Sequence, residues 1–350
     1  MTSSEDFLRE SVRRVTAGET LSAQEMGDVV QHLMKGQLSE SPFNLLASAL
    51  ICSIKTRGET VEEIVGAART LKSHQRHVKV ASSTGALLDT CGTGGDGAHL
   101  INISTITSMV VASLGVTVAK HGNRSVSSSC GSADLLEALG YPLLNDPELV
   151  SRCAANTGFG FLFAPHFHPA LKNLAGLRRS LGVRTIFNML GPLVNPAGVT
   201  HQLMGVFDRN IVAPIAKAAG QLGIHRCCVV HGEGGLDEIS PCGVTYVALS
   251  DHERVTEFEW TPQSFGADPV PLSSLSGGDA TANAATCLQL LNGERPEMAS
   301  AVAMNCAASL WVVDPACSLE EGYRKAYSAI MSGEVAEFFE KAKSYALSVV

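Results

Sequence analysis

Long runs of one residue class are missing from this sequence. No apolar stretch approaches the roughly 18 residues that a membrane-spanning helix needs, so we expect no membrane segment. The 26 basic residues form no long run and the net charge is -8, which argues against general affinity for nucleic acids. The first residues are charged throughout and contain no apolar core of the kind found in a signal peptide.

Cysteines at metal-ligand spacing are also missing. The ten cysteines are scattered and none forms a C-x-x-C motif, and the adjacent pair Cys227 and Cys228 is a poor candidate for a disulfide or a metal site. Scattered thiols and the lack of a targeting segment indicate a reducing compartment, so we expect a cytoplasmic protein. With 350 residues, 45% of them hydrophobic, the chain is long enough for two ordinary domains with a sizeable core.

Residues 1–75 carry only helical signals. Ser22 with Glu25, and Thr60 with Glu63, form capping boxes that each precede an amphipathic segment. Nothing in this part indicates chemistry, so packing and self-association are its expected roles. We predict a small all-helical domain over 1–75, rejoined by part of 168–196, and a larger α/β domain over 76–350.

Strand and helix patterns alternate from Ala86 onward. Apolar runs predict strands near 86–88, 116–119, 203–207, 227–231 and 244–249, whereas 161–165 is expected to be a loop and the chain beyond Thr281 to be mostly helical. Alternation of this kind predicts a mostly parallel sheet with the functional site at the carboxyl ends of its strands.

The strongest signal for a binding site lies in residues 89–140. The first strand leads into GTGGDG at 92–97, and NIST at 102–105 opens a helix, so backbone N–H groups and a helix N-terminus face one loop. The second strand leads into Lys120 and Arg124, and small hydroxyl residues follow. Such donors and charges suit a substrate with several phosphates. A glycine-rich structural turn is the alternative.

This pattern differs from two common nucleotide-binding motifs. No G-x-x-x-x-G-K-[ST] sequence occurs, so the loop is not a P-loop. The strand after the glycine loop ends in Lys120 rather than in an acidic residue, which weakens a match to the dinucleotide-binding fingerprint.

Adjacent carboxylates follow another predicted strand. Asp237 and Glu238 lie in a glycine-rich loop, and beside a polyphosphate site they suggest Mg²⁺, which takes one or two protein carboxylates and fills its other positions with water and phosphate. A solvated turn is the alternative. We interpret Asp96 as a residue that orients the glycine loop or a substrate hydroxyl.

Other polar residues have no single assignment from the pattern. His121 is either a general base or a hydrogen-bond donor. Arg178, Arg179 and Arg184 belong to a basic segment, and the pattern does not distinguish among them.

Taken together, these segments resemble anthranilate phosphoribosyltransferases. The matching segments occur in the expected order: GTGGDG at 92–97, NIST at 102–105, KHGNRSVSS at 120–128, GSADLLEALG at 131–140, FLFAP at 161–165, HPALK at 168–172, RRSLGVRTIFNMLGPLVNP at 178–196 and VVHGEGGLDEIS at 229–240. The resemblance implies a helical domain hinged to a larger α/β domain and a homodimer formed through the helical domains. It also implies transfer of the ribosyl 5-phosphate group from phosphoribosyl pyrophosphate (PRPP) to the amino nitrogen of anthranilate, with Mg²⁺ and release of pyrophosphate.

The resemblance further implies roles for individual residues. Those that would hold PRPP are Gly92, Gly95, Asp96, Asn102, Ile103, Ser104, Thr105, Lys120, His121, Gly122, Asn123, Arg124, Ser125, Val126, Ser127, Ser128 and Ser132. Those that would hold Mg²⁺ are Ser104, Asp237 and Glu238. Anthranilate would contact Gly92, Asn123 and Arg178, with His121 and Gly191 near it.

Three departures from the family pattern concern phosphate affinity. Leu100 stands where the family usually has threonine or serine, and Ile101 replaces a common phenylalanine. Ser129 and Cys130 replace lysine and serine, so one positive charge is missing.

Two other functions stay open at this point. A pyrimidine nucleoside phosphorylase shares the architecture but uses free phosphate. A nucleic-acid-binding relative would lack the enzyme motifs, and the intact GTGGDG, NIST and LDEIS segments together with the negative net charge argue against it.

Overall fold

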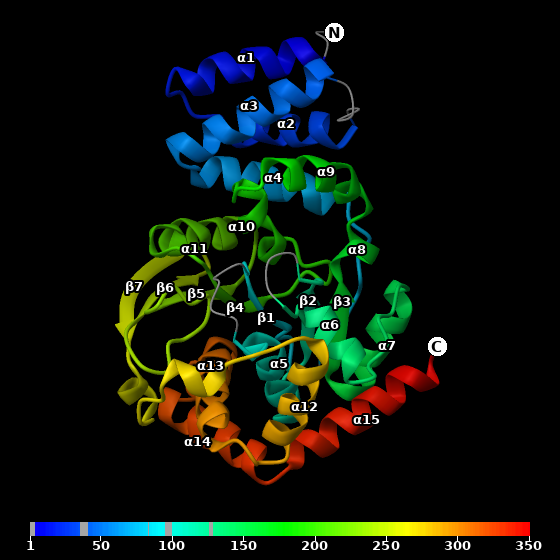
Figure 1. The fold of residues 1–350 in the computed structure, drawn as a ribbon, viewed down its shortest axis with the longest axis vertical. Helices are drawn as coiled ribbons and strands as arrows, with labels where there is room; N and C mark the ends of the chain where they lie inside the picture. The colour runs from blue at the N-terminus through cyan, green and yellow to red at the C-terminus, as the bar shows by residue number, and fades with distance from the viewer. Residues whose placement is uncertain (1–3, 36–40, 83, 95–99, 126–128) are drawn as a thin grey trace.

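The computed structural model describes residues 4–35, 41–82, 84–94, 100–125 and 129–350. Figure 1 shows a stack of N-terminal helices above a larger part in which helices surround a sheet. Within the described ranges, the helices are either too short or not apolar enough to cross a membrane.

The N-terminal stack begins with helices that the sequence predicts correctly. They are α1 (Ser4–Thr16), α2 (Ala23–Lys35), α3 (Ser41–Arg57) and α4 (Val61–Ser73). Both expected capping boxes are present: Glu25 N donates to Ser22 Oγ at 3.3 Å, and Glu63 N donates to Thr60 Oγ1 at 3.2 Å. These caps satisfy N–H groups that the first turn of a helix leaves unpaired.

Two helices from the middle of the chain pack onto this stack. After α8 (Ala164–Phe167) and a short 3-10 helix (Pro169–Leu171), α9 (Lys172–Leu181) packs against α2 and α3, and α10 (Ile186–Leu193) packs against α3 and α4. Asn173 Nδ2 of α9 donates to Met34 O of α2 at 2.8 Å. Leu174 and Phe187 belong to the same buried cluster as the N-terminal helices. The segment therefore connects the helical stack to the sheet, while the domain limits given above stay a prediction.

Seven strands within the described ranges form one sheet in the order β3-β2-β1-β4-β5-β6-β7. Their bounds are β1 (Leu88–Gly92), β2 (Val118–Gly122), β3 (Phe159–Phe163), β4 (His201–Gly205), β5 (Arg226–Gly232), β6 (Thr245–Asp251) and β7 (Arg254–Trp260). The strands from β3 to β5 in this order are parallel, and β6 and β7 continue the sheet in antiparallel pairing. The predicted mostly parallel sheet is confirmed.

Helices cover both faces of the sheet (Figure 1). They are α5 (Ile103–Ser113), α6 (Ser132–Ala138), α7 (Pro147–Thr157), α11 (Val212–Gln221), α12 (Ala280–Leu291), α13 (Pro296–Val313), α14 (Leu319–Met331) and α15 (Glu334–Ser348), with short 3-10 helices at Arg209–Ile211, Pro262–Phe265 and Leu272–Leu275. In β5, Cys227 and Val229 face the layer of α11, whereas Cys228 and Val230 face that of α13. Side chains of a strand alternate between faces, so a strand buried on both sides is a continuous apolar run.

Two local predictions are wrong. The segment 161–165, expected to be a loop, contributes the end of β3 and the start of α8, since all of β3 is buried. His121, expected in a loop, belongs to β2, which continues past Lys120 to Gly122. The antiparallel strand β7, most of whose residues are exposed or half-buried, was not predicted.

Candidate active site

Parallel strands bring the predicted loops to one edge of the sheet. β1 ends at Gly92 and β4 at Gly205, and these two residues are paired in register. β2 and β5 run parallel to them and end at Gly122 and Gly232. The loops that follow therefore start from neighbouring points, as expected for a site at the carboxyl ends of parallel strands.

The carboxylates of the predicted metal site contact both parts of the phosphate loop. Asp237 Oδ2 accepts a hydrogen bond from Gly94 N at 2.7 Å. Glu238 Oε1 accepts one from Ser104 N at 3.0 Å, at the N-terminus of α5. The structure thus brings together residues that are more than 130 positions apart in the sequence.

Two strand-ending glycines make room for Asp237. A Cβ atom on Gly92 would lie 2.4 Å from Asp237 Oδ2, and one on Gly205 would lie 1.5 Å from Asp237 O. Any side chain at either position would push Asp237 away. The sheet edge is therefore shaped around this carboxylate, which is itself buried.

The N-terminus of α5 presents its backbone to the site more than its side chains. Ile103 and Thr105 are buried, with 2% and 1% of their surfaces exposed, so a ligand would meet only their backbone groups. Thr90 Oγ1 donates to Ser104 O at 2.8 Å and ties this first turn to β1. The N–H groups of Ile103 and Thr105 bond to backbone oxygens of residues 101 and 102, and the positive end of the helix dipole still favours anions near this turn.

Lys120 lies in the interior of the protein, whereas we expected its charge to be available to phosphates at the loops. Only 2% of it is exposed, and its Nζ donates to Thr90 O at 2.5 Å. Asp89, fully buried, accepts from His121 N and from Asn195 Nδ2, at 3.1 and 2.8 Å. Burial raises the pKa of Asp89, and the positive charge of Lys120 opposes that shift. Lys120 therefore compensates a buried carboxylate beneath the loops.

Sequence reasoning missed Asp89 and Asn195. Their network links β1, β2 and the segment after α10 below the site. The available signal was a carboxylate inside an otherwise apolar strand, which is costly unless it is paired.

His121 is a buried, neutral imidazole. Burial, followed by the nearby His168, holds the pKa of His121 well below its usual range, and the backbone of Gly191 opposes this shift. Burial also lowers the pKa of His168 to about 4, and the two ring centres lie 5.1 Å apart. A base that is hard to protonate accepts protons poorly, so this position favours a hydrogen-bonding role for His121 over general-base catalysis.

The start of the second loop is held by α6. Ser132 Oγ accepts from Asn123 N at 3.1 Å, and Ser125 N donates to Asp134 at 3.0 Å. Arg124 pairs with Asp134 at 2.9 Å and with Glu137 at 2.5 Å. The charge of Arg124 is thus balanced by these two carboxylates. To bind a phosphate, Arg124 would have to leave Asp134 and Glu137.

Arg178 lies on α9, on the side of the helical stack. It is half-buried, and within the described ranges its guanidinium forms no hydrogen bond or ion pair. Burial lowers the pKa of Arg178 below its ordinary value. Its neighbour Arg179 is exposed, and Arg184 stacks 4.4 Å from the centre of the Phe207 ring. Arg178 is therefore the best candidate of the three to bind a carboxylate, because it is half-buried and its guanidinium has no hydrogen bond or ion pair in the described part of the chain.

Five of the residues predicted to contact PRPP belong to two short segments of the phosphate loops. Gly95, Asp96, Val126, Ser127 and Ser128 lie outside the described residues.

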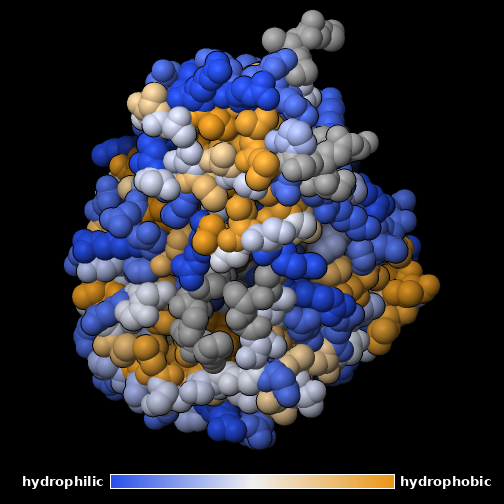
Figure 2. Space-filling view, turned by 45° about the horizontal axis from the view of Figure 1, so that its top comes forward, coloured by the Kyte–Doolittle hydropathy of each residue, from blue (hydrophilic) through white to orange (hydrophobic). Residues whose placement is uncertain are grey.

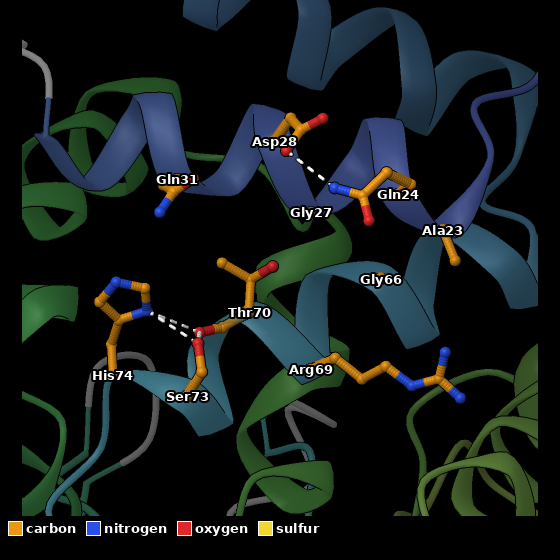
Figure 3. Close-up of a pocket in the computed structure, with 10 residues that line it drawn as sticks. All are labelled: Ala23, Gln24, Gly27, Asp28, Gln31, Gly66, Arg69, Thr70, Ser73 and His74. Atoms are coloured by element: carbon orange, nitrogen blue, oxygen red, sulfur yellow. Dashed lines mark hydrogen bonds between the residues drawn. The ribbon is translucent and has the colours of Figure 1, made fainter.

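A separate groove lies between α2 and α4 (Figure 3). Its volume is about 210 Å³, and it is lined by Ala23, Gln24, Gly27, Asp28, Gln31, Gly66, Arg69, Thr70, Ser73 and His74. Polar groups along it bond to one another: Gln24 donates to Asp28 at 3.0 Å, and His74 Nδ1 lies 2.9 Å from Thr70 O. No residue predicted for the active site lines this groove in the described part of the chain.

Comparison with known families accounts for nearly the whole chain. Residues 84–336 match the model described as "Glycosyl transferase family, a/b domain", and residues 9–75 match "Glycosyl transferase family, helical bundle domain". The anthranilate phosphoribosyltransferase of Myxococcus xanthus is 47% identical over 93% of this chain and 95% of its own length.

Solved structures show the same arrangement. The anthranilate phosphoribosyltransferase of Thermus thermophilus is 41% identical, with a TM-score of 0.88 over 96% of this chain and 99% of that one. The Saccharomyces cerevisiae enzyme, solved in complex with PRPP and Mg, is 26% identical with a TM-score of 0.86 over 97% of this chain and 98% of that one. The yeast enzyme has also been solved in complex with 4-fluoroanthranilate.

Proposed function

The chain belongs to the anthranilate phosphoribosyltransferase family, and from this premise we propose how it performs the reaction. It transfers the 5-phosphoribosyl group of PRPP to the amino group of anthranilate and releases pyrophosphate. The relatives support this function and not the nucleoside phosphorylase alternative. The product, N-(5-phosphoribosyl)anthranilate, places the enzyme in tryptophan biosynthesis, and its ten scattered cysteines suit the cytoplasm.

The observation that carries this proposal is the placement of Asp237 and Glu238. Both carboxylates bond to backbone N–H groups of the loop that would hold the phosphates, and the lack of side chains on Gly92 and Gly205 leaves the space that Asp237 occupies. A helix N-terminus favours the phosphates of PRPP, and the adjacent carboxylates favour a cation bound to those phosphates.

The same residues fit Mg²⁺. Asp237, Glu238 and the hydroxyl of Ser104 offer oxygen atoms, the donors that Mg²⁺ prefers, and the phosphates of PRPP would supply further oxygens. When bound, Mg²⁺ would supply charge neutralisation for the departing pyrophosphate.

The protein itself would stabilise charge and position the reactants. Breaking the bond between ribose and pyrophosphate leaves negative charge on the pyrophosphate, which would be stabilised by the positive end of the α5 dipole. The ribose carbon becomes positive and is attacked by the amine. Because the anthranilate amine is already uncharged, no strong protein base is needed, in agreement with the low pKa of His121.

The acceptor would lie between the two parts of the molecule. Asn123 and His121 belong to the α/β part, Gly191 to α10, and Arg178 to the helical side. We propose that Arg178 binds the anthranilate carboxylate and that closure of a hinge between the two parts encloses the acceptor.

The test of this function is a fluorescence assay. Anthranilate fluorescence should fall only when enzyme, PRPP and Mg²⁺ are all present, and one pyrophosphate should be released per anthranilate consumed. Adding EDTA should stop the reaction, and excess Mg²⁺ should restore it. Release of thymine from thymidine and phosphate, without anthranilate consumption, would instead establish the phosphorylase alternative.

We also propose that the protein is a homodimer formed through its helical domains. Figure 2 shows apolar side chains gathered over the helical part of the molecule. Leu45 of α3 and Val183 after α9 are 67% and 56% exposed, although both are large apolar residues. Exposed apolar patches of this kind are typical of protein–protein interfaces.

Replacing Leu45 by glutamate should break this dimer, because it would place a charge in the apolar interface. Light scattering at micromolar concentration should give about twice 36.8 kDa for the wild type and about 36.8 kDa for Leu45→Glu. Leu347→Glu is the matched control, since Leu347 is 54% exposed but lies on α15 at the opposite end of the molecule. A monomeric wild type, or a dimeric Leu45→Glu variant, would contradict the proposed interface.

A further inference from the structure

We propose that Asn283 is a positioning residue that keeps the two phosphate loops in register for PRPP, an inference that rests on the proposed function. Asn283 lies in the first turns of α12, about 180 residues after the glycine loop, and only 4% of its surface is exposed. It acts through Asn102, at the start of α5, and through Cys130, just before α6.

The side-chain amide of Asn283 uses both of its ends. Its Nδ2 donates to Asn102 Oδ1 at 3.0 Å, and its Oδ1 accepts from Gly278 N at 2.6 Å. Asn102 in turn donates from its own Nδ2 to Cys130 O at 2.9 Å. A continuous chain of hydrogen bonds therefore runs from α12 to the start of α5 and on to the end of the second loop.

This chain of hydrogen bonds takes the side chain of Asn102 away from the N-terminus of α5. Asn102 is the N-cap residue, yet its side chain makes no capping hydrogen bond with the N–H groups of the helix. Asparagine at this position normally accepts such a bond. Because Asn283 and Cys130 occupy the Asn102 amide, it is turned away from the first N–H groups of α5, one of which, that of Ser104, bonds to Glu238.

The backbone before α12 supports the same contact. Ile101 N donates to Leu275 O at 3.0 Å, and Leu100 and Ser276 form an isolated antiparallel bridge. A Cβ atom on Gly277 would lie 2.6 Å from Leu100 O, so only glycine lets the two segments approach this closely. The turn before α12 is therefore fitted to residues 100–102, where the glycine loop leads into α5.

Few other residues could replace Asn283. Alanine would leave Asn102 Oδ1 and Gly278 N, both in half-buried residues, without these partners, which is costly for polar groups. Aspartate has nearly the same shape and keeps an acceptor for Gly278 N, but as a carboxylate it cannot donate to Asn102. An amide side chain at position 283 is expected if it orients Asn102, whereas an apolar residue would be sufficient for packing alone.

Asn283→Ala should weaken PRPP binding about tenfold, the effect of losing roughly one well-formed hydrogen bond. Calorimetric titration with PRPP and Mg²⁺ gives the Kd, and steady-state kinetics gives both KM values. We expect the Kd and KM for PRPP to rise together, while the KM for anthranilate stays within about twofold of the wild type. Asn283→Asp should also weaken PRPP binding, and it should disturb folding less because aspartate has nearly the same shape as asparagine and still accepts from Gly278 N.

Gln289→Ala is the matched control. Gln289 lies on the same helix and accepts hydrogen bonds from Arg295 at 2.9 and 2.6 Å, so this variant also loses side-chain bonds of α12. It should leave PRPP affinity unchanged. If Gln289→Ala weakened PRPP as much as Asn283→Ala, or if Asn283→Ala raised both KM values in parallel with a fall in Tm, the residue would be structural and the inference wrong.

A double-mutant cycle with Asn102→Ala tests the route of the effect. If Asn283 acts through Asn102, adding Asn283→Ala to Asn102→Ala should change the Kd for PRPP less than twofold, whereas independent roles would give multiplied effects. Because the readout is PRPP binding, a wild type that bound PRPP but did not consume anthranilate would refute the proposed reaction while leaving this test valid. Unchanged PRPP binding in Asn283→Ala and Asn283→Asp would overturn the inference alone.

Discussion

Asp237→Asn is expected to lower kcat/KM for PRPP by about a hundredfold to a thousandfold, the cost of removing a major electrostatic group from a transition state. Asparagine keeps an oxygen that can accept from Gly94 N, as Asp237 Oδ2 does at 2.7 Å. It also fits the space left by Gly92 and Gly205. The substitution therefore removes the negative charge while it preserves the shape of the loop.

Mg²⁺ dependence is the measurement that identifies the cause. If Asp237 holds the cation, Asp237→Asn should need a higher Mg²⁺ concentration for half-maximal rate, and Glu238→Gln should behave alike because glutamine can still accept from Ser104 N. Asp268→Asn removes the same charge from an exposed position and should leave the rate and the Mg²⁺ response unchanged. An Asp237→Asn enzyme with the wild-type Mg²⁺ response would show that the carboxylate does not hold the metal.

The arrangement of strands and loops could be predicted because its signals are local. The glycine segment after β1 and the carboxylates Asp237 and Glu238 after β5 each follow an apolar run, and parallel pairing then places them at one edge. The capping boxes of α2 and α4 are equally local, since each joins residues three positions apart. Such features depend on neighbouring residues and on the general rules of sheet packing.

What the sequence did not reveal depends on tertiary contacts. Lys120 was expected to supply charge to the phosphates, yet β2 continues through it, and the carboxylate of Asp89 compensates its charge in the interior. Asn283 reaches Asn102 across about 180 residues, and no local pattern marks an asparagine near the start of a helix as part of a distant site. The balance of Arg124 by Asp134 and Glu137 likewise appears only once α6 is in place.

Arg178→Ala is expected to raise the KM for anthranilate about tenfold to a hundredfold. A guanidinium forms a bidentate pair with a planar carboxylate, and losing a charge-assisted contact of this kind costs roughly 1.5–3 kcal/mol. Arg178 is suited to this role because it is half-buried and forms no hydrogen bond or ion pair in the described part of the chain. Partial burial strengthens a charge pair because less water screens it.

The KM for PRPP should change little in Arg178→Ala, because the phosphates would lie at the sheet edge while Arg178 lies on α9 beside α2 and α3. Arg178→Lys should have an intermediate effect, since it keeps the charge but loses the planar fork. Arg179→Ala removes the neighbouring exposed charge and serves as the control, with both KM values expected to match the wild type. If Arg178→Ala instead weakened PRPP and left anthranilate unaffected, Arg178 would not bind the acceptor, and Arg179 or Arg184 would be the residue to test next. Because all three arginines occur within seven consecutive positions, the measurement would also show whether burial or sequence position selects the residue that binds the carboxylate.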